Sequence, residues 1–177
     1  SLVVFTPPVL APAAADDIGA RASAVGMLTA LIYATSVLSA LWSGQVIERV
    51  GAIRFSQLCL LCCSAGMAIM AFPHPVIVAL GAIVVGVGYG AVTPASSSVL
   101  ADRVPPGMRS FIFSLKQTGV PIGGAIAGAM VPPLIAVFGW QAAALVVAAL
   151  GLLVVASAQT VQRKLDAAAP SRRAAPG

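Results

Sequence analysis

Residues 43–54 read SGQVIERVGAIR and place one carboxylate and two arginines between long apolar stretches. The intervals 22–47, 55–101 and 117–162 contain no Asp, Glu, Lys or Arg. Because a membrane-spanning helix needs about 20 apolar residues, each interval is long enough to cross a bilayer, and the last two must each turn back once. The charged stretch is therefore predicted to be a short loop between two transmembrane helices.

The overall composition is that of a membrane protein. Hydrophobic residues make up 59% of the chain and charged residues 8%, and the mean hydropathy is +1.01. Soluble domains contain about 25% charged residues, so we predict an all-α, polytopic transmembrane helical bundle whose surroundings are the lipid bilayer. The net charge of +5 does not indicate nucleic-acid binding, because no basic surface with interleaved aromatic residues is visible.

Proline and glycine mark the two reversals. Pro73-His74-Pro75 divides one long interval, and Pro132-Pro133 with Phe138-Gly139-Trp140 divides the other. The apolar stretch 1–15 is short and has no initiator methionine, so we interpret it as the end of a cut helix; a cleaved signal peptide is the alternative, although no basic leader precedes it. We predict a bundle over 1–160, a cytoplasmic linker over 161–177, and complete spans near 23–44, 55–72, 76–100, 110–136 and 140–160.

The basic residues predict the orientation, because cytoplasmic loops of membrane proteins are enriched in Lys and Arg. One set of alternate loops holds only Arg21, beside Asp16 and Asp17, while Lys116 falls inside a predicted span. We therefore predict a multi-pass protein of an inner cell membrane. The basic residues assigned to its cytoplasmic side are Arg49, Arg54, Arg103, Arg109, Arg163, Lys164, Arg172 and Arg173.

No catalytic or metal-binding constellation is visible. Cys59, Cys62 and Cys63 lie within a predicted apolar helix, where we interpret them as packing residues. His74 is the only histidine and is predicted to lie at the other side of the membrane, whereas a zinc site needs about four ligands. The glycine-rich stretch 86–92 lies inside a span and is not a phosphate loop. We therefore expect no enzymatic activity, no cofactor and no metal.

Small residues recur at four-residue spacing in two predicted spans, a pattern that lets helices approach closely in a bilayer. Pro121 lies in the second of these spans, where it removes one backbone hydrogen bond and bends the helix. The residues that we assign to helix packing are Gly86, Gly90, Gly119, Pro121, Gly123, Gly124 and Gly128.

The stretch 43–54 resembles the signature loop G-x-L-x-D-R-x-G-R-[RK] of the major facilitator superfamily, which joins the second and third helices of these transporters. Glu48 replaces the usual Asp, while Ala52 and Ile53 stand where the family prefers basic residues. An ordinary loop with cytoplasmic positive charge is the alternative interpretation. The residues that occupy the first five specified positions are Gly44, Val46, Glu48, Arg49 and Gly51.

The loop ADRVPPGMRS at 101–110 falls where this family joins its fourth and fifth helices. The resemblance implies that the two loops hold the cytoplasmic side closed through one network of charges. The residues of this predicted gating loop are Gly44, Glu48, Arg49, Gly51, Arg54, Asp102, Arg103 and Arg109.

The stretch KQTGVPIGGAIAG at 116–128 is similar to the G-P-x-x-G-G motif in helix five of the antiporter branch. It departs from that motif, because Val120 precedes Pro121 and one residue separates Pro121 from the glycine pair. The stretch looks more like bacterial permeases of the cyanate and organic-anion type, which implies an anionic solute.

The resemblance covers nearly the whole chain but only the amino-terminal half of a transporter. It implies secondary active transport of a small solute by alternating access, with a coupling ion and a missing carboxyl-terminal half as partners. Helices one and four line the cavity in this family, which points to Thr6, Tyr89 and Thr93, although each is equally compatible with plain packing. Lys116 and Gln117 complete the cavity candidates.

Two questions stay open at this stage. Lys116 either reaches the membrane interface or pairs with Asp102 as an anchor, or it faces the cavity and attracts an anion. The chain as a whole is either half of a transporter, or a six-helix scaffold or half-size subunit that forms dimers.

Overall fold

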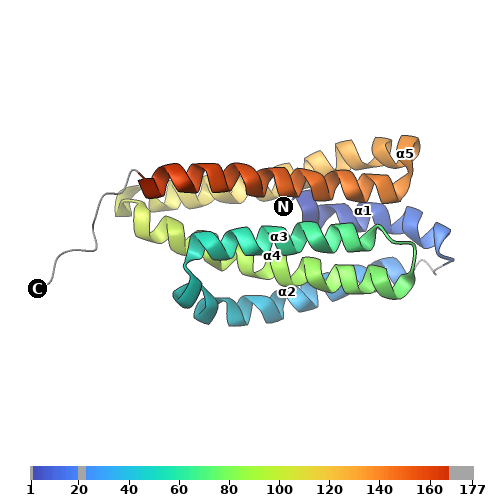
Figure 1. The fold of residues 1–177 in the computed structure, drawn as a ribbon, viewed down its shortest axis with the longest axis horizontal. Helices are drawn as coiled ribbons and strands as arrows, with labels where there is room; N and C mark the ends of the chain where they lie inside the picture. The colour runs from blue at the N-terminus through green and yellow to red at the C-terminus, as the bar shows by residue number, and fades with distance from the viewer. Residues whose placement is uncertain (1, 20–22, 168–177) are drawn as a thin grey trace, which may run out of the picture.

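The computed structural model describes residues 2–19 and 23–167, and its elements are helices throughout this part of the chain. Figure 1 shows an elongated bundle whose helices run along a common long axis. The all-α fold predicted from the sequence is confirmed. The elements are α1 (Leu2–Asp17), α2 (Ser23–Val50), α3 (Ala52–Met70), α4 (Pro75–Arg103), the 3-10 turn η1 (Pro106–Met108) and α5 (Arg109–Ala167).

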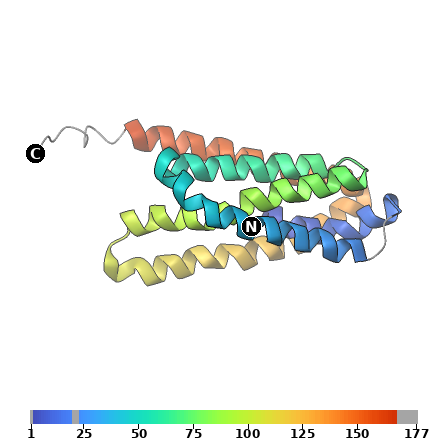
Figure 2. The same ribbon diagram turned by 90° about the horizontal axis from the view of Figure 1, so that it is seen from below.

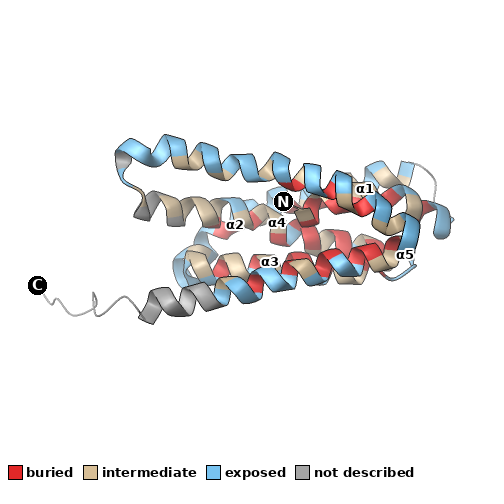
Figure 3. Cartoon of the chain, turned by 90° about the horizontal axis from the view of Figure 1, so that it is seen from above, coloured by how far each residue is buried: buried red, intermediate tan, exposed pale blue. Residues whose placement is uncertain are grey.

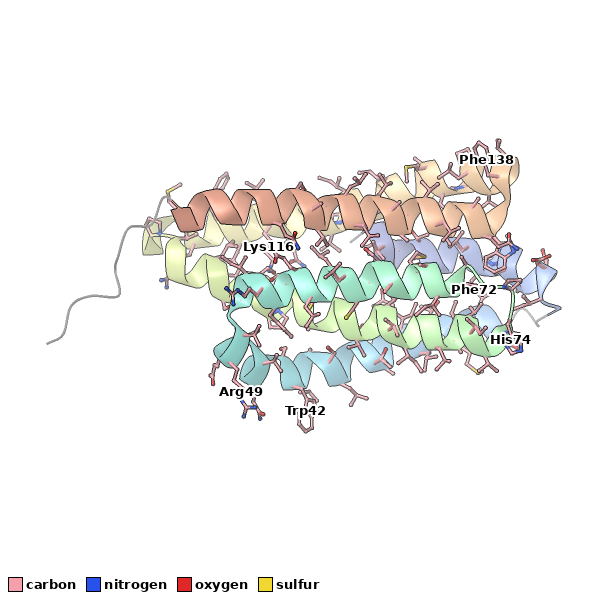
Figure 4. All side chains as sticks on the ribbon, viewed as in Figure 1. Trp42, Arg49, Phe72, His74, Lys116 and Phe138 are labelled. Atoms are coloured by element: carbon pink, nitrogen blue, oxygen red, sulfur yellow. The ribbon has the colours of Figure 1, made fainter. Side chains whose placement is uncertain are left out.

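The connections alternate between the two ends of the bundle. Gly51 joins α2 to α3, and η1 joins α4 to α5, at the end on the left of Figure 1. The α1–α2 and α3–α4 connections lie at the other end, where Figure 4 labels Phe72 and His74. Below, the arginine end is the end with Arg49, Arg54 and Arg109, and the aspartate end is the end with Asp16 and Asp17.

α5 is broken at a single residue. Its 59 residues would extend about 90 Å in one straight helix, three times the thickness of a hydrocarbon core of about 30 Å. Gly139 has φ 81° and ψ 165°, a conformation that glycine adopts without steric cost, and the chain reverses there, as Figures 1 and 2 show. α5 therefore consists of a first arm, 109–138, and a second arm, 140–167.

The number of helices depends on whether the two arms of α5 are counted as one element or as two. The described part of the chain contains five α-helices, and four of them, α2 to α5, are long and apolar enough to cross a membrane. The sequence predicts a cut helix and five complete spans, the fourth of which runs through Pro132 and Pro133 to about residue 136 and is followed by a short connection before residue 140. The first arm of α5 continues to Phe138, and Gly139 alone makes the connection.

α4 is the central helix of the bundle. It packs against α2 and α3, while α1 and α3 pack against α5. Figure 3 shows that buried residues concentrate toward the aspartate end and that the first arm of α5 is mostly exposed near the arginine end. The largest fully buried hydrophobic side chains are Ile32, Met67, Val85, Val131 and Val147.

Glycines set the closest approaches of α4 to its neighbours. Gly86 and Gly90 both face α2, and a Cβ added at Gly86 would lie 2.5 Å from the carbonyl oxygen of Ile32. Gly66 of α3 faces Gly81 of α4 in the same way, since a Cβ at Gly66 would lie 2.8 Å from the Gly81 carbonyl oxygen. The backbones are therefore in direct contact at these positions, as small residues allow in membrane helices.

The glycines of the first arm of α5 have a different environment. A Cβ at Gly119 or Gly128 would meet nothing within 4 Å, and one at Gly124 would make only an ordinary contact of 3.6 Å with α1. Gly123 is buried and Pro121 is exposed. Within the described residues, Gly119, Gly124 and Gly128 are therefore not points of close backbone contact with another helix.

Candidate functional site

Lys116 links the first arm of α5 to α4. Its Nζ donates a hydrogen bond to Ser97 Oγ at 2.9 Å and another to the carbonyl oxygen of Thr93 at 3.3 Å. The same atom lies 5.9 Å from the centroid of the Phe113 ring, within the range of a cation–π contact. The side chain is half-buried, and within the described residues its partners are neutral groups rather than carboxylates.

A polar face on α4 lies opposite Lys116. Tyr89, Thr93 and Ser97 recur at four-residue spacing, so their side chains project from one side of the helix. Tyr89 is half-buried and Thr93 is exposed. Lys116 lies seven residues after Arg109, where α5 begins, which is about 10 Å along the helix. It therefore contacts the part of the polar face that is nearer the arginine end.

The other two predicted cavity residues lie in different surroundings. Gln117 follows Lys116 on α5 and is exposed. Thr6 is fully buried in α1, and its hydroxyl donates a hydrogen bond to the carbonyl oxygen of Leu2 at 2.9 Å. Thr6 has no exposed surface for a solute in this structure, so it is left out of the site proposed below.

Five of the eight residues of the predicted gating loop lie around the turn between α2 and α3, although only Gly51 is in the turn itself: Gly44, Glu48 and Arg49 belong to the end of α2, and Arg54 belongs to the start of α3. Gly51 has φ 87°, which glycine tolerates, and its N–H donates to the carbonyl oxygen of Ile47 at 2.9 Å. Glu48, Arg49 and Arg54 are all exposed, and no ion pair joins these three side chains. The turn therefore has the predicted backbone geometry, while its charged side chains extend into the surroundings.

Of the three charged residues predicted in the loop between α4 and α5, the structure describes the side chain of Arg109. Arg109 Nε donates a hydrogen bond to the carbonyl oxygen of Val104 at 3.2 Å. The side chains of Asp102 and Arg103 lie outside the described residues, so a charge network between the two loops stays a prediction. At Gly44, a Cβ would meet nothing within 4 Å, so the glycine of the signature loop is not a point of close helix contact here.

A polar contact at the aspartate end ties α1 to the second arm of α5. Asp17 Oδ2 accepts hydrogen bonds from Trp140 Nε1 at 3.0 Å and from Gln141 Nε2 at 3.1 Å. Because Trp140 and Gln141 directly follow Gly139, the carboxylate lies at the start of a helix, where the helix dipole favours negative charge. Sequence reasoning missed this contact, since the partners are 123 residues apart and only Gly139 signals that a helix begins there.

Hydroxyl and thiol groups join α4 to its neighbours. Ser36 Oγ donates to the Gly86 carbonyl oxygen at 3.1 Å, and Cys63 Sγ donates to the Val85 carbonyl oxygen at 3.7 Å. All three cysteines are free thiols. In the part of the chain that the structure describes, no group of three or more His, Cys, Asp or Glu residues is placed to hold a metal ion.

The sequence of the chain is similar to those of known proteins. The chain is 34% identical over 141 residues to "Probable anion transporter 7" of Oryza sativa subsp. japonica, a match that covers 78% of this chain and 32% of that protein. "Probable anion transporter 6" of the same organism is 33% identical over 141 residues, covering 78% of this chain and 33% of the relative. The "Hexuronate transporter" of Bacillus subtilis (strain 168) is 22% identical over 147 residues, covering 82% and 35% respectively.

The chain spans about a third of the length of these curated relatives. All three are named as transporters, which are not enzymes, and the apolar helices of the chain indicate a multi-pass membrane protein. The model of the family described as Major Facilitator Superfamily matches residues 2–175. This match over nearly the whole sequence means that the chain belongs to the Major Facilitator Superfamily.

Proposed function

We propose that this chain is the amino-terminal half of a secondary active transporter for a small anionic solute, located in an inner cell membrane. The observation that carries the proposal is Lys116, a half-buried ammonium whose partners in the described part of the chain are the neutral Thr93 and Ser97. A cation in such a partly desolvated position attracts an anion more strongly than one in water. The names of the relatives support an anion, since two refer to anion transport and the third to hexuronate, a sugar acid.

The proposed solute site combines this charge with neutral polar groups. Tyr89, Thr93 and Ser97 supply hydroxyl groups from α4, and Gln117 supplies an amide next to Lys116. One charged group and a few neutral ones on an otherwise apolar surface are typical of sites for small ligands. The ammonium provides attraction, while the neutral groups distinguish one anion from another.

Transport by alternating access needs a second body that moves against this one. We propose that a carboxyl-terminal half packs against α2, because few residues in the apolar part of this helix are buried. Its exposed apolar side chains include Met27, Val37 and Leu41. Glu48 then pairs with a partner across the arginine end in the outward-facing state, and a coupling ion supplies the driving force.

Uptake measurements on the full-length protein test the role of Lys116. Lys116→Ala is expected to raise the apparent KM for the anion at least about tenfold, which corresponds to about 1.4 kcal/mol, and Lys116→Arg should restore part of it. Thr118→Ala is the matched control, because it removes an exposed hydroxyl group from the same arm of α5 whose hydrogen bond goes to the carbonyl oxygen of Leu115, and it should leave KM nearly unchanged. If Lys116→Ala lowers the amount of protein in the membrane but leaves KM unchanged, Lys116 is an anchor.

The second candidate function is a half-size subunit or scaffold that forms dimers. The observation that favours it is the exposed apolar face of α2, which a second copy of the chain could cover. Reconstitution of the chain alone separates the two candidates. Solute uptake by liposomes that contain only this chain, as a dimer, would support the half-size transporter. Uptake that requires a carboxyl-terminal half supports the proposal above.

A further inference from the structure

A groove of about 390 Å³ lies between α2, α3 and α4, toward the arginine end. α2 and α3 form its walls and α4 forms its floor, and Lys116 is not part of it. Its lining is mostly apolar, interrupted by a few hydroxyl and thiol groups that point to no particular polar ligand. The principal lining residues are Leu38, Trp42, Val46, Phe55, Leu58 and Ala91.

The length of the groove matches one leaflet of a bilayer. Its lining on α2 runs from Thr35 to Val46, which is about 17 Å at about 1.5 Å per residue. Half of a hydrocarbon core of about 30 Å is about 15 Å. Because the groove ends just before the turn at Gly51, an acyl chain that fills it would place its headgroup at the arginine end.

Two arginines lie at this end of the groove. Arg49 is seven residues after Trp42, so the two side chains leave α2 within about 20° of each other, and Figure 4 shows both projecting from the same side of α2. Arg54 lies one turn before Leu58 on α3. Glu48 is rotated about 100° from Arg49 on the helix, which directs its carboxylate away from the groove. Neither arginine forms an ion pair within the described residues.

We propose that this groove binds one anionic phospholipid, with an acyl chain along α2 and α3 and the phosphate between Arg49 and Arg54. Arginine side chains bind phosphate oxygens through paired hydrogen bonds. The apolar lining and the leaflet-long shape select a lipid over free phosphate. The two positive charges favour a headgroup with net negative charge over a zwitterionic one.

Trp42 provides a direct reporter of this site. The chain has two tryptophans, and Trp140 is only 6% exposed and lies at the aspartate end, so subtracting the signal of a Trp42→Phe variant isolates the groove. Tryptophan fluorescence is measured in bilayers that contain either phosphatidylglycerol or phosphatidylcholine with brominated acyl chains, which quench on contact. We expect phosphatidylglycerol to associate with the groove at least about threefold more strongly.

Charge variants test the recognition. Arg49→Gln with Arg54→Gln should bring the ratio of the two lipids close to one, because the headgroup loses its partners. Arg109→Gln removes an arginine at the same end that belongs to α5, a helix that does not line the groove, and it should keep the preference.

Three results would overturn the proposal. Equal quenching by both lipids in the parent protein would mean that bulk lipid fills the groove. Loss of preference in Arg109→Gln as large as in the double variant would mean that overall surface charge attracts the lipid. The absence of Trp42 quenching by either lipid would mean that protein covers the groove, either a second copy or another part of the full-length protein.

Discussion

Asp17→Ala is expected to destabilise the aspartate end of the bundle. The substitution removes the acceptor for two donors from the second arm of α5, Trp140 Nε1 and Gln141 Nε2. The Trp140 side chain is only 6% exposed, so its N–H group is left without a partner in a buried position. The Gln141 side chain is half-buried and regains hydrogen bonds to solvent more easily.

The size of the effect follows from these contacts. A hydrogen bond to a charged group contributes about 1.5–3 kcal/mol when buried, while the net helix-dipole contribution is small, because the carboxylate lies at the start of the second arm but also at the end of α1. Because Asp17 itself is exposed and solvent screens its charge, we expect a net loss of about 1–2 kcal/mol. Asp17→Asn keeps an acceptor oxygen but loses the charge, so it should lose about half as much.

Thermal unfolding in detergent micelles measures this loss, with a thiol-reactive dye that reports exposure of the buried Cys59 and Cys63. For a protein of this size about 1 kcal/mol corresponds to about 2–4 °C in Tm, so Asp17→Ala should lower Tm by about 2–8 °C. Combining it with Trp140→Phe tests the contact itself, because two residues that interact give a smaller loss together than the sum of the single losses. An unchanged Tm for Asp17→Ala, or fully additive losses, would refute this account.

Four other substitutions test the fold and the gating loop. Gly90→Ala should lower Tm, because its Cβ would lie 2.6 Å from the carbonyl carbon of Ser36 and overpacking costs about 1–3 kcal/mol; Gly128→Ala, with nothing within 4 Å of its Cβ, should leave Tm unchanged or raise it. Gly139→Ala should cost about 1–2 kcal/mol, since φ is 81° and alanine disfavours that region, and an unchanged Tm would argue against the reversal at this residue. Glu48→Gln should leave Tm nearly unchanged but slow uptake and raise labelling from the cytoplasm, and normal uptake would argue against gating.

The sequence was sufficient for the helical fold and for the approximate position where α5 turns, but not for the shape of that turn. Long charge-free intervals predict membrane helices because the bilayer requires about 20 apolar residues. Pro132 and Pro133 resemble a helix end, yet the helix continues through them, since proline is tolerated inside membrane helices when neighbouring groups satisfy the freed carbonyls. The sequence places the turn near Phe138-Gly139-Trp140, and the backbone angles of Gly139 show that a single residue makes it.

In the candidate site, the sequence predicted the charged residue, Lys116, but not which residue its ammonium contacts. Lys116 is conspicuous because it is a charged residue inside the predicted span 110–136. Its partner Ser97 has serines on both sides, and only the rotation of α4 selects Ser97, one turn after Thr93, as the one that contacts the ammonium. Thr6 is suggested by its depth in the membrane, but its burial depends on the rotation of α1, which depth does not specify.

The two ends of the bundle differ in the contacts between their helices, and this difference determines which link a bound solute would weaken. At the aspartate end, the Asp17 contacts and most of the buried side chains fix α1 against the second arm of α5. Toward the arginine end, α4 and the first arm of α5 share little contact besides the hydrogen bonds of Lys116. On the proposed function, an anion at Lys116 competes with Thr93 and Ser97 for the same ammonium. Binding would therefore weaken the link between α4 and α5 where the bundle is least packed, and a ligand that interacts differently with two arrangements shifts their populations.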